Sequence, residues 1–224
     1  MTRLVLFDID GTLVRTGGAG VRAFAKTFAN EFLIPEATRD LNFSGRTDPS
    51  MVRECFQKNG IPLTTENFEH FFSVYPHWLA YYLNVLPGGP CPGVFDVIND
   101  LKRLPDPPTL GLLTGNIRLG AELKLRHHGL WDFFELGAFS DEHEDRHRLA
   151  AIAHGRGAEL RKAKVHAEQV LVIGDTPLDV ACGKAIGAKT LAVATGSFSV
   201  KDLAGCDPDY ILDDLTKFST RHLK

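Results

Sequence analysis

Short apolar runs bounded by turn residues recur along the chain. They lie at Leu4 to Phe7, Thr109 to Leu113, Val170 to Ile173 and Thr190 to Val193, with a weaker fifth run at Tyr210 to Leu212. An unbroken apolar run of this length is typical of a strand that is buried on both faces of a parallel sheet. The pattern therefore predicts five buried strands.

Helical periodicity fills the segments between most of these runs. It covers Val94 to Leu104, Ile117 to His128, Arg148 to Lys162 and Leu178 to Ile186. Gly129 and Gly187 follow two of these segments, as glycine often does where a helix ends. Strands that alternate with helices predict an α/β fold, a Rossmann-like parallel sheet with helices on both faces.

Residues 15–87 interrupt this alternation. Apolar positions from Val21 to Phe32 repeat at helical spacing, and two further helices are expected at Pro49 to Lys58 and Glu66 to Leu83. The aromatic residues of the third segment are expected to form the core of this insertion, with a stacking site for a base or sugar as the alternative. This pattern predicts a helical domain inserted after the first strand.

The insertion divides the chain into two expected domains. Residues 1–14 and 88–224 would form the α/β core, and residues 15–87 the helical insertion. The glycine-rich segments 16–20 and 86–90 are candidate hinges, because glycine permits backbone rotation where a lid closes, or else they are ordinary loops.

Composition narrows the classes of function. The chain has 224 residues, 44% of them hydrophobic and 24% charged, which is typical of a globular protein. A net charge of −3 argues against a broad basic surface for nucleic acid. The four cysteines form no CxxC pair, and no apolar stretch approaches the length of a membrane span. We expect a cytoplasmic protein without a signal peptide, a zinc ribbon or a disulfide framework.

Two carboxylates follow the first apolar run, in the sequence Asp8-Ile-Asp10-Gly-Thr12. Side chains at positions i and i+2 of a strand point to the same side, so Asp8 and Asp10 are expected to lie together. Neighbouring carboxylates repel each other, and a site that holds both ionised favours a hard cation such as Mg²⁺. The pair predicts a nucleophile beside an acid, with a capped strand end as the alternative.

Two further polar clusters follow the strands that begin at Thr109 and Val170. The first is Thr114-Gly115-Asn116, and the second contains Asp175 and Asp179. Helix capping explains either cluster taken alone. However, ligands of an open parallel sheet bind outside the carboxyl ends of its strands, where all three clusters are expected to meet.

These three motifs, in this order, resemble those of the haloacid dehalogenase superfamily of phosphotransferases. The insertion is similar to the helical cap of its subfamily I members, such as phosphoglycolate phosphatases and β-phosphoglucomutases. The segment Gly45-Arg46-Thr47-Asp48 is similar to a loop of that cap. The resemblance covers nearly the whole chain and implies a Mg²⁺-dependent phosphatase that acts on a small phosphorylated metabolite.

The resemblance also implies the roles of the acids. Asp8 would attack phosphorus and become an aspartyl phosphate, while Asp10 would protonate the leaving oxygen and later activate water. The Asp8 carboxylate, the Asp10 carbonyl and Asp175 would hold Mg²⁺. Asp179 would act from behind these ligands, on metal-bound water or on a basic residue.

The remaining roles fall to groups that contact the substrate. Thr114 and the backbone amides of Gly115 and Asn116 would bind phosphoryl oxygens at a helix N-terminus. Gly18 and Arg46, in the cap, would contact the rest of the substrate.

The basic residue departs from the commonest pattern of the superfamily. Many members carry a Lys-Pro pair before the last acidic motif, whereas the corresponding stretch here contains Arg146 and Arg148. Arginine remains charged and binds phosphate oxygens through two donors, so it can replace lysine in this role. We assign the role to Arg146, with Arg148 as the competitor and a solvated helix start as the alternative for both.

Other functions stay open at this point. A phosphomutase would use the same aspartyl phosphate and return the group to a sugar, and the difference lies in whether the closed cap excludes water. A catalytically silent binding module is the alternative from another class, although it need not keep the full set of acids. A haloacid dehalogenase would not be expected to need Asp10.

Overall fold

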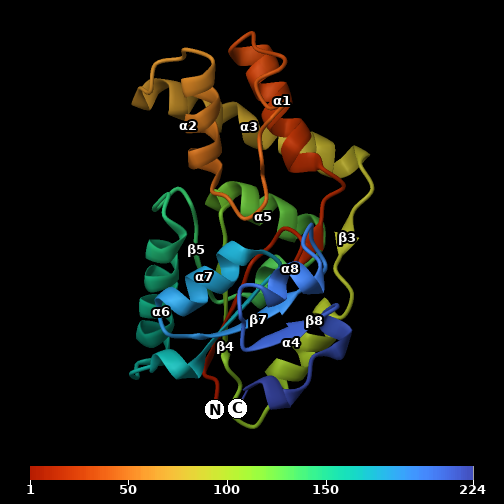
Figure 1. The fold of residues 1–224 in the computed structure, drawn as a ribbon, viewed down its shortest axis with the longest axis vertical. Helices are drawn as coiled ribbons and strands as arrows, with labels where there is room; N and C mark the ends of the chain where they lie inside the picture. Colours follow the sequence, from red (N-terminus) through yellow and green to blue (C-terminus); the bar gives the residue numbers. More distant parts are fainter. Residues whose placement is uncertain (224) are drawn as a thin grey trace.

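A computed structural model describes residues 1–223, which form a six-stranded parallel sheet flanked by helices (Figure 1). The strands are β1 (Leu4–Phe7), β4 (Thr109–Leu113), β5 (Leu136–Ala138), β6 (Val170–Gly174), β7 (Lys189–Val193) and β8 (Tyr210–Leu212). They lie in the order β5-β4-β1-β6-β7-β8, which places β1 between β4 and β6. The predicted parallel sheet is confirmed.

Both faces of the sheet are covered, which explains why its strands are continuously apolar. Val5 and Phe7 of β1 belong to the cluster that contains α4 (Val94–Lys102) and α5 (Arg118–His127). Leu4 and Leu6 point to the other face, into the cluster with α6 (Arg146–Arg161) and α7 (Pro177–Ala185). The two faces therefore take alternate residues of one strand.

The predicted helices are present with small shifts at their ends. Helix α6 begins at Arg146 and not at Arg148, because the Asp145 carboxylate accepts a hydrogen bond from the His147 N–H at 2.8 Å and caps the helix there. Shorter helical segments are α8 (Val200–Ala204), Trp131–Phe133, Ala167–Gln169, Leu215–Lys217 and Thr220–Leu223. Within residues 1–223, no helix is both long and apolar enough to span a membrane.

Strand β5 was not expected from the sequence. It contains only Leu136, Gly137 and Ala138, so it lacks an apolar run that could be recognised. Its place in the sheet depends on parallel pairing with β4, where Gly111 lies opposite Leu136. A three-residue edge strand is thus defined by its neighbour and not by its own composition.

The segment 15–87 contains the three predicted helices, α1 (Ala19–Glu31), α2 (Asp48–Lys58) and α3 (Thr65–Val85). They lie together at one end of the molecule, beyond α5 (Figure 1). Their facing sides form a hydrophobic cluster rich in aromatic rings, including Phe24, Phe28, Phe71 and Tyr75. Ile117, directly before α5, joins this cluster and connects it to the rest of the molecule.

Two chain connections join the helical segment to the sheet. They pair as a short antiparallel ribbon of β2 (Val14–Arg15) and β3 (Gly89–Pro90), so they run side by side. Of the candidate hinge 16–20, Ala19 and Gly20 already belong to α1.

Candidate active site

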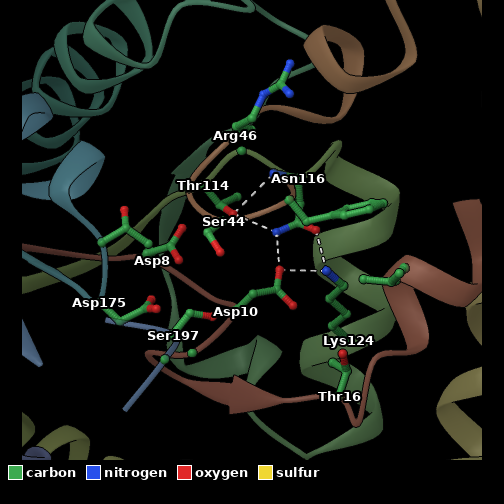
Figure 2. Close-up of a pocket in the computed structure, with 18 of the residues that line it drawn as sticks. Asp8, Asp10, Thr16, Ser44, Arg46, Thr114, Asn116, Lys124, Asp175 and Ser197 are labelled. Atoms are coloured by element: carbon green, nitrogen blue, oxygen red, sulfur yellow. Dashed lines mark hydrogen bonds and ion pairs between the residues drawn. The ribbon is translucent and has the colours of Figure 1, made fainter. Parts of the chain in front are cut away.

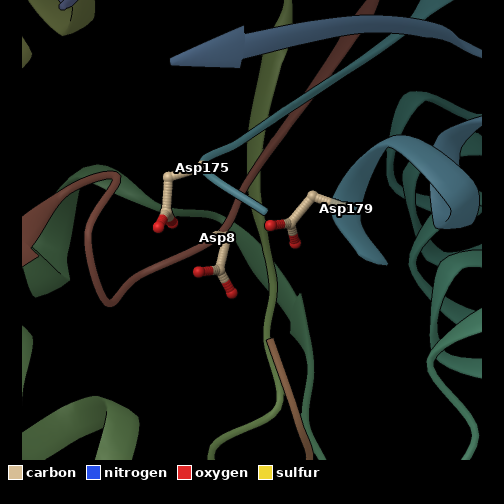
Figure 3. Close-up of side chains that lie close together, drawn as sticks. All are labelled: Asp8, Asp175 and Asp179. Atoms are coloured by element: carbon tan, nitrogen blue, oxygen red, sulfur yellow. The ribbon is translucent and has the colours of Figure 1, made fainter. Parts of the chain in front are cut away.

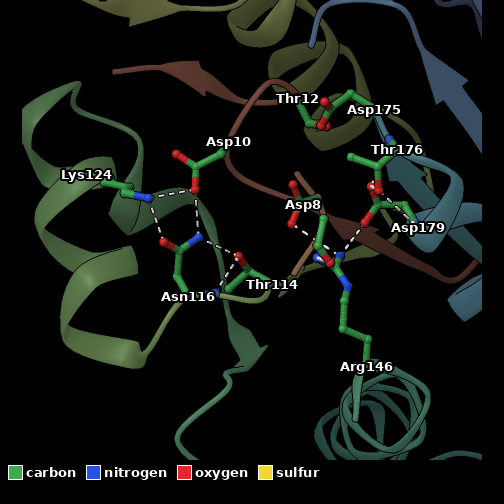
Figure 4. A network of polar contacts seen from close by, with 11 residues as sticks. Asp8, Asp10, Thr12, Thr114, Asn116, Lys124, Arg146, Asp175, Thr176 and Asp179 are labelled. Carbon is green, nitrogen blue, oxygen red and sulfur yellow. Dashed lines mark hydrogen bonds and ion pairs between the residues drawn. The ribbon is translucent and has the colours of Figure 1, made fainter. Parts of the chain in front are cut away.

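The carboxyl ends of β1, β4 and β6 meet at one edge of the sheet, where the predicted polar clusters come together (Figure 4). Asp8 follows β1, Thr114 follows β4, and Asp175 follows β6. A cavity of about 430 Å³ opens at this edge, and α1, α2 and α3 contribute to its far wall. The convergence of separate strand ends on one cavity makes this the candidate active site.

Three buried acids form the floor of the site. Asp8, Asp175 and Asp179 each place a carboxylate oxygen within 4.8 Å of the other two (Figure 3). Burial raises the pKa of both Asp8 and Asp175 above the usual range, and the charge of Asp179 raises it further. A cluster of this kind is relieved either by bound protons or by a cation.

The donor set fits a hard divalent cation. It offers carboxylate oxygens without sulfur or imidazole, which is the ligand chemistry that Mg²⁺ prefers. The Thr12 hydroxyl donates a hydrogen bond of 3.0 Å to Asp175 Oδ1, which fixes the direction of that carboxylate. The residues therefore suit the metal that the sequence predicted.

Arg146 reaches the acids from the first residue of α6. Its side chain is buried, and its Nη2 lies 3.3 Å from Asp8 Oδ1. The same nitrogen also forms an ion pair with Asp179. A third contact is a hydrogen bond of 3.0 Å to the Gly45 carbonyl. Burial opposes the charge of Arg146, but the two carboxylates keep its pKa above the ordinary value. Arg148, the competitor, is exposed.

Both carboxylate oxygens of Asp179 are engaged by the protein. Oδ1 pairs with Arg146, while Oδ2 accepts hydrogen bonds from the Thr176 N–H at 3.0 Å and the Thr176 hydroxyl at 2.6 Å. Asp179 thus caps the start of α7 and orients the guanidinium that contacts Asp8.

The segment 114–116 forms a tight turn at the start of α5. Thr114 Oγ1 accepts hydrogen bonds from the Asn116 N–H at 3.2 Å and from Asn116 Nδ2 at 2.8 Å. A Cβ atom at Gly115 would lie 2.1 Å from the Arg46 carbonyl oxygen, so only glycine allows this close approach. The turn presents its backbone at the beginning of a helix, a common location for anion binding.

A lysine that sequence reasoning missed lies beside Asp10. Lys124 of α5 is buried, and its Nζ is 2.6 Å from Asp10 Oδ2 and 2.6 Å from Asn116 Oδ1 (Figure 4). Asn116 Nδ2 donates to the same Asp10 oxygen at 2.8 Å. Helical periodicity places Lys124 on the apolar side of α5, which is a signal for a buried lysine, but only the fold shows that its partner is Asp10.

The loop before α2 contacts the turn 114–116 directly. The Asp48 N–H donates to the Gly115 carbonyl at 2.7 Å, and Asp48 Oδ2 accepts from the Ile117 N–H at 2.8 Å. Asp48 is buried, and burial raises its pKa to about 7. The loop Gly45–Asp48 is therefore hydrogen-bonded to the edge of the sheet through Asp48.

The two predicted cap contacts differ in their surroundings. Gly18 lines the cavity with a left-handed φ of 85°, and a Cβ atom there would meet nothing within 4 Å. Arg46 also lines the cavity, but its guanidinium forms an ion pair with Glu54 and points away from Asp8 and Asp10 (Figure 2).

The sequence profile of the haloacid dehalogenase-like hydrolases matches residues 5–193, which include the strand ends described above. The chain belongs to this family. Both the resemblance and the expectation of an enzyme of this hydrolase class are confirmed.

Individual haloacid dehalogenase-like proteins are similar over nearly their whole length. The chain is 24% identical over 220 residues to pyrophosphatase PpaX of Oceanobacillus iheyensis, covering 97% of this chain and 95% of that protein. It is 24% identical over 222 residues to phosphoglycolate phosphatase of Agrobacterium fabrum, and the match covers 96% of this chain and 89% of that protein. A crystal structure of a CbbY variant from Rhodobacter sphaeroides, in complex with xylulose-(1,5)bisphosphate, superposes with a TM-score of 0.79 at 18% identity and covers 100% of both chains. This last likeness concerns the fold.

Proposed function

We propose that this protein is a Mg²⁺-dependent phosphatase that hydrolyses a phosphate monoester of a small metabolite through an aspartyl phosphate on Asp8. The observation that carries the proposal is the position of Asp8. Its carboxylate lies between the buried acids Asp175 and Asp179, contacts Arg146 and faces the cavity. A carboxylate in such surroundings suits a nucleophile whose charge is balanced on several sides.

Asp8 and Asp10 divide the chemistry between them. An oxygen of Asp8 attacks phosphorus, and the bond to the leaving oxygen breaks as Asp10 gives that oxygen a proton. Asp10 then takes a proton from a water molecule, whose oxygen attacks the phosphoryl group and releases Asp8 with inorganic phosphate. The side chain of Asp10 is 44% exposed, which supports a role in contact with substrate and water.

The transferred phosphoryl group carries negative charge, which local donors offset. Arg146 lies close enough to Asp8 to attract both the nucleophile and the incoming phosphoryl oxygens. The Thr114 hydroxyl and the amides of Gly115 and Asn116 bind the remaining oxygens at the start of α5.

Asp8 and Asp175, together with the Asp10 carbonyl, would hold Mg²⁺. When bound, the ion neutralises charge between the Asp8 carboxylate and the phosphoryl group. Asp179 positions Arg146 and does not need to contact the metal, since both of its oxygens already have protein partners.

Residues 15–87 serve as a cap that selects the substrate. Gly18 and Arg46 of this segment line the same cavity as the acids, so they are candidates to contact the leaving group of a monoester. The paired strands β2 and β3 form the connection about which this cap would open and close.

The experiment is a screen of phosphorylated metabolites with purified protein, with release of inorganic phosphate as the readout. Phosphoglycolate and pyrophosphate belong in the screen because similar proteins carry those names. Each compound is tested with Mg²⁺ and after chelation, beside an Asp8→Asn control that keeps the shape of the side chain.

We expect Mg²⁺-dependent phosphate release from at least one monoester, and none from Asp8→Asn. Transfer of the phosphoryl group to a second hydroxyl, without release of phosphate, would replace hydrolysis by a mutase reaction. Equal activity in the parent and Asp8→Asn would reject the proposal.

A further inference from the structure

Lys124 has an unusual environment for a lysine. It belongs to α5, is only 4% exposed, and places Nζ against two polar groups of the candidate site. Lysine is rarely buried without a partner, because loss of water around an ammonium group is costly. Here Asp10 Oδ2 is that partner at 2.6 Å, and the ionised form of Asp10, left once it has given up its proton, supplies the compensating charge.

The contact with Asn116 has a second consequence. A carboxamide has a donor end and an acceptor end, and Lys124 engages Oδ1, the acceptor end, at 2.6 Å. The donor end, Nδ2, is thereby turned toward Asp10 Oδ2 at 2.8 Å and toward Thr114 Oγ1 at 2.8 Å. One ammonium group thus fixes the orientation of both neighbours.

These contacts converge on a single oxygen of Asp10. Both Lys124 and Asn116 donate to Oδ2, while the side chain as a whole remains 44% exposed (Figure 2). The carboxylate is therefore held on one side and accessible from the cavity on the other. This is the arrangement expected of an acid that must meet a leaving oxygen at a defined place.

We propose that Lys124 is a positioning residue for proton transfer by Asp10. Lys124 binds Asp10 Oδ2 and fixes the orientation of the Asn116 amide. Together these contacts hold the Asp10 side chain in one rotamer, in which its free oxygen faces the leaving oxygen of the substrate. The inference rests on the proposed phosphatase function.

The leaving group provides a readout that a general structural role would not change. A p-nitrophenolate departs easily, whereas an unsubstituted phenolate is more basic and depends more strongly on protonation by an acid. In this mechanism kcat/KM covers the steps up to loss of the leaving group, so the later hydrolysis of the aspartyl phosphate does not enter the comparison.

The experiment compares kcat/KM for p-nitrophenyl phosphate and phenyl phosphate in the parent, Lys124→Met, Lys124→Arg and Asp10→Asn. Lys201→Met is the matched control, because Lys201 is an exposed lysine of α8. We expect Lys124→Met to raise the ratio of the two constants by about tenfold or more, as Asp10→Asn does, with Lys124→Arg between it and the parent. The ratio does not depend on the fraction of folded protein, so partial unfolding of a variant cannot produce the effect.

In the double variant, Asp10→Asn with Lys124→Met, the ratio of the two kcat/KM values should be no higher than in Asp10→Asn alone, because both substitutions remove the same function. An unchanged ratio in Lys124→Met would overturn the inference while leaving the phosphatase proposal intact. Absence of activity in the parent toward every ester would instead refute the phosphatase function.

Discussion

The buried carboxylate of Asp48 accepts a hydrogen bond from the Ile117 N–H at 2.8 Å, at the point where α5 begins. The two residues belong to different parts of the chain, one at the start of α2 and the other beside the turn 114–116. Because the Asp48 N–H also binds the Gly115 carbonyl, one residue joins the helical segment to the turn through two hydrogen bonds. The position of the helical segment relative to this turn should therefore depend on Asp48.

The protonation of Asp48 predicts a pH effect on stability. Burial raises its pKa from 3.8 to about 7 against the lowering effects of Lys124 and the Ile117 N–H, while Asp10 and Asp141 raise it further. Below 3.8 the folded and unfolded states both carry the proton, but between 3.8 and about 7 only the folded state retains it. The stabilisation is thus complete at low pH and is lost as the pH rises through about 7.

Asp48→Asn is the appropriate comparison, because asparagine keeps an oxygen acceptor but does not titrate. Denaturant unfolding from about pH 5 to about pH 7 should show the parent losing stability relative to Asp48→Asn, by up to about 1.4 kcal/mol per pH unit. A difference in free energy that stays constant across this range would contradict the buried, protonated form of Asp48.

Arg146 provides a sharper test of catalysis. Its contact with Asp8 predicts that Arg146→Ala lowers kcat on the order of 10²-fold or more, as loss of a preorganised electrostatic contact does. Arg148→Ala is the control, because Arg148 is exposed only two residues away, and its kcat should match the parent. Steady-state kinetics of a phosphate ester measure both. A normal rate for Arg146→Ala would remove the arginine from the mechanism.

The acid cluster predicts a choice of metal. Mg²⁺, which Asp8 and Asp175 would hold, should support turnover and Ca²⁺ should inhibit it, because Ca²⁺ prefers more ligands and longer bonds than Mg²⁺. Phosphate release is measured after chelation and after addition of each ion. Full activity in the chelated protein would argue against a metal at this cluster.

Much of the fold follows from periodicity alone. The buried strands β1, β4, β6 and β7 are evident in the sequence because both of their faces are covered, whereas the edge strand β8 is only half-buried and gives a weaker pattern. Strand β5 escaped notice because Leu136–Ala138 is short, contains glycine and depends on β4 for its definition. Apolar periodicity places the start of α6 at Arg148, because it does not reveal the hydrogen bond by which Asp145 caps the helix two residues earlier.

The site shows a similar limit. Residues at strand ends, such as Asp8 and Asp175, could be selected because the edge of a parallel sheet gathers them. Lys124 could not, since it lies 114 positions from Asp10 and only the fold brings them together. The orientation of the Arg46 side chain could not be predicted either, because its ion pair with Glu54 depends on how the chain turns into α2.

The most direct test of the account is a search for phosphate covalently attached to the protein. A ³²P-labelled ester that the parent hydrolyses is mixed with the protein and Mg²⁺, and the reaction is stopped in acid after a few milliseconds to seconds. The account predicts acid-stable, hydroxylamine-sensitive label on the parent and none on Asp8→Asn. Turnover without label on the protein, or label that persists in Asp8→Asn, would contradict Asp8 as the nucleophile.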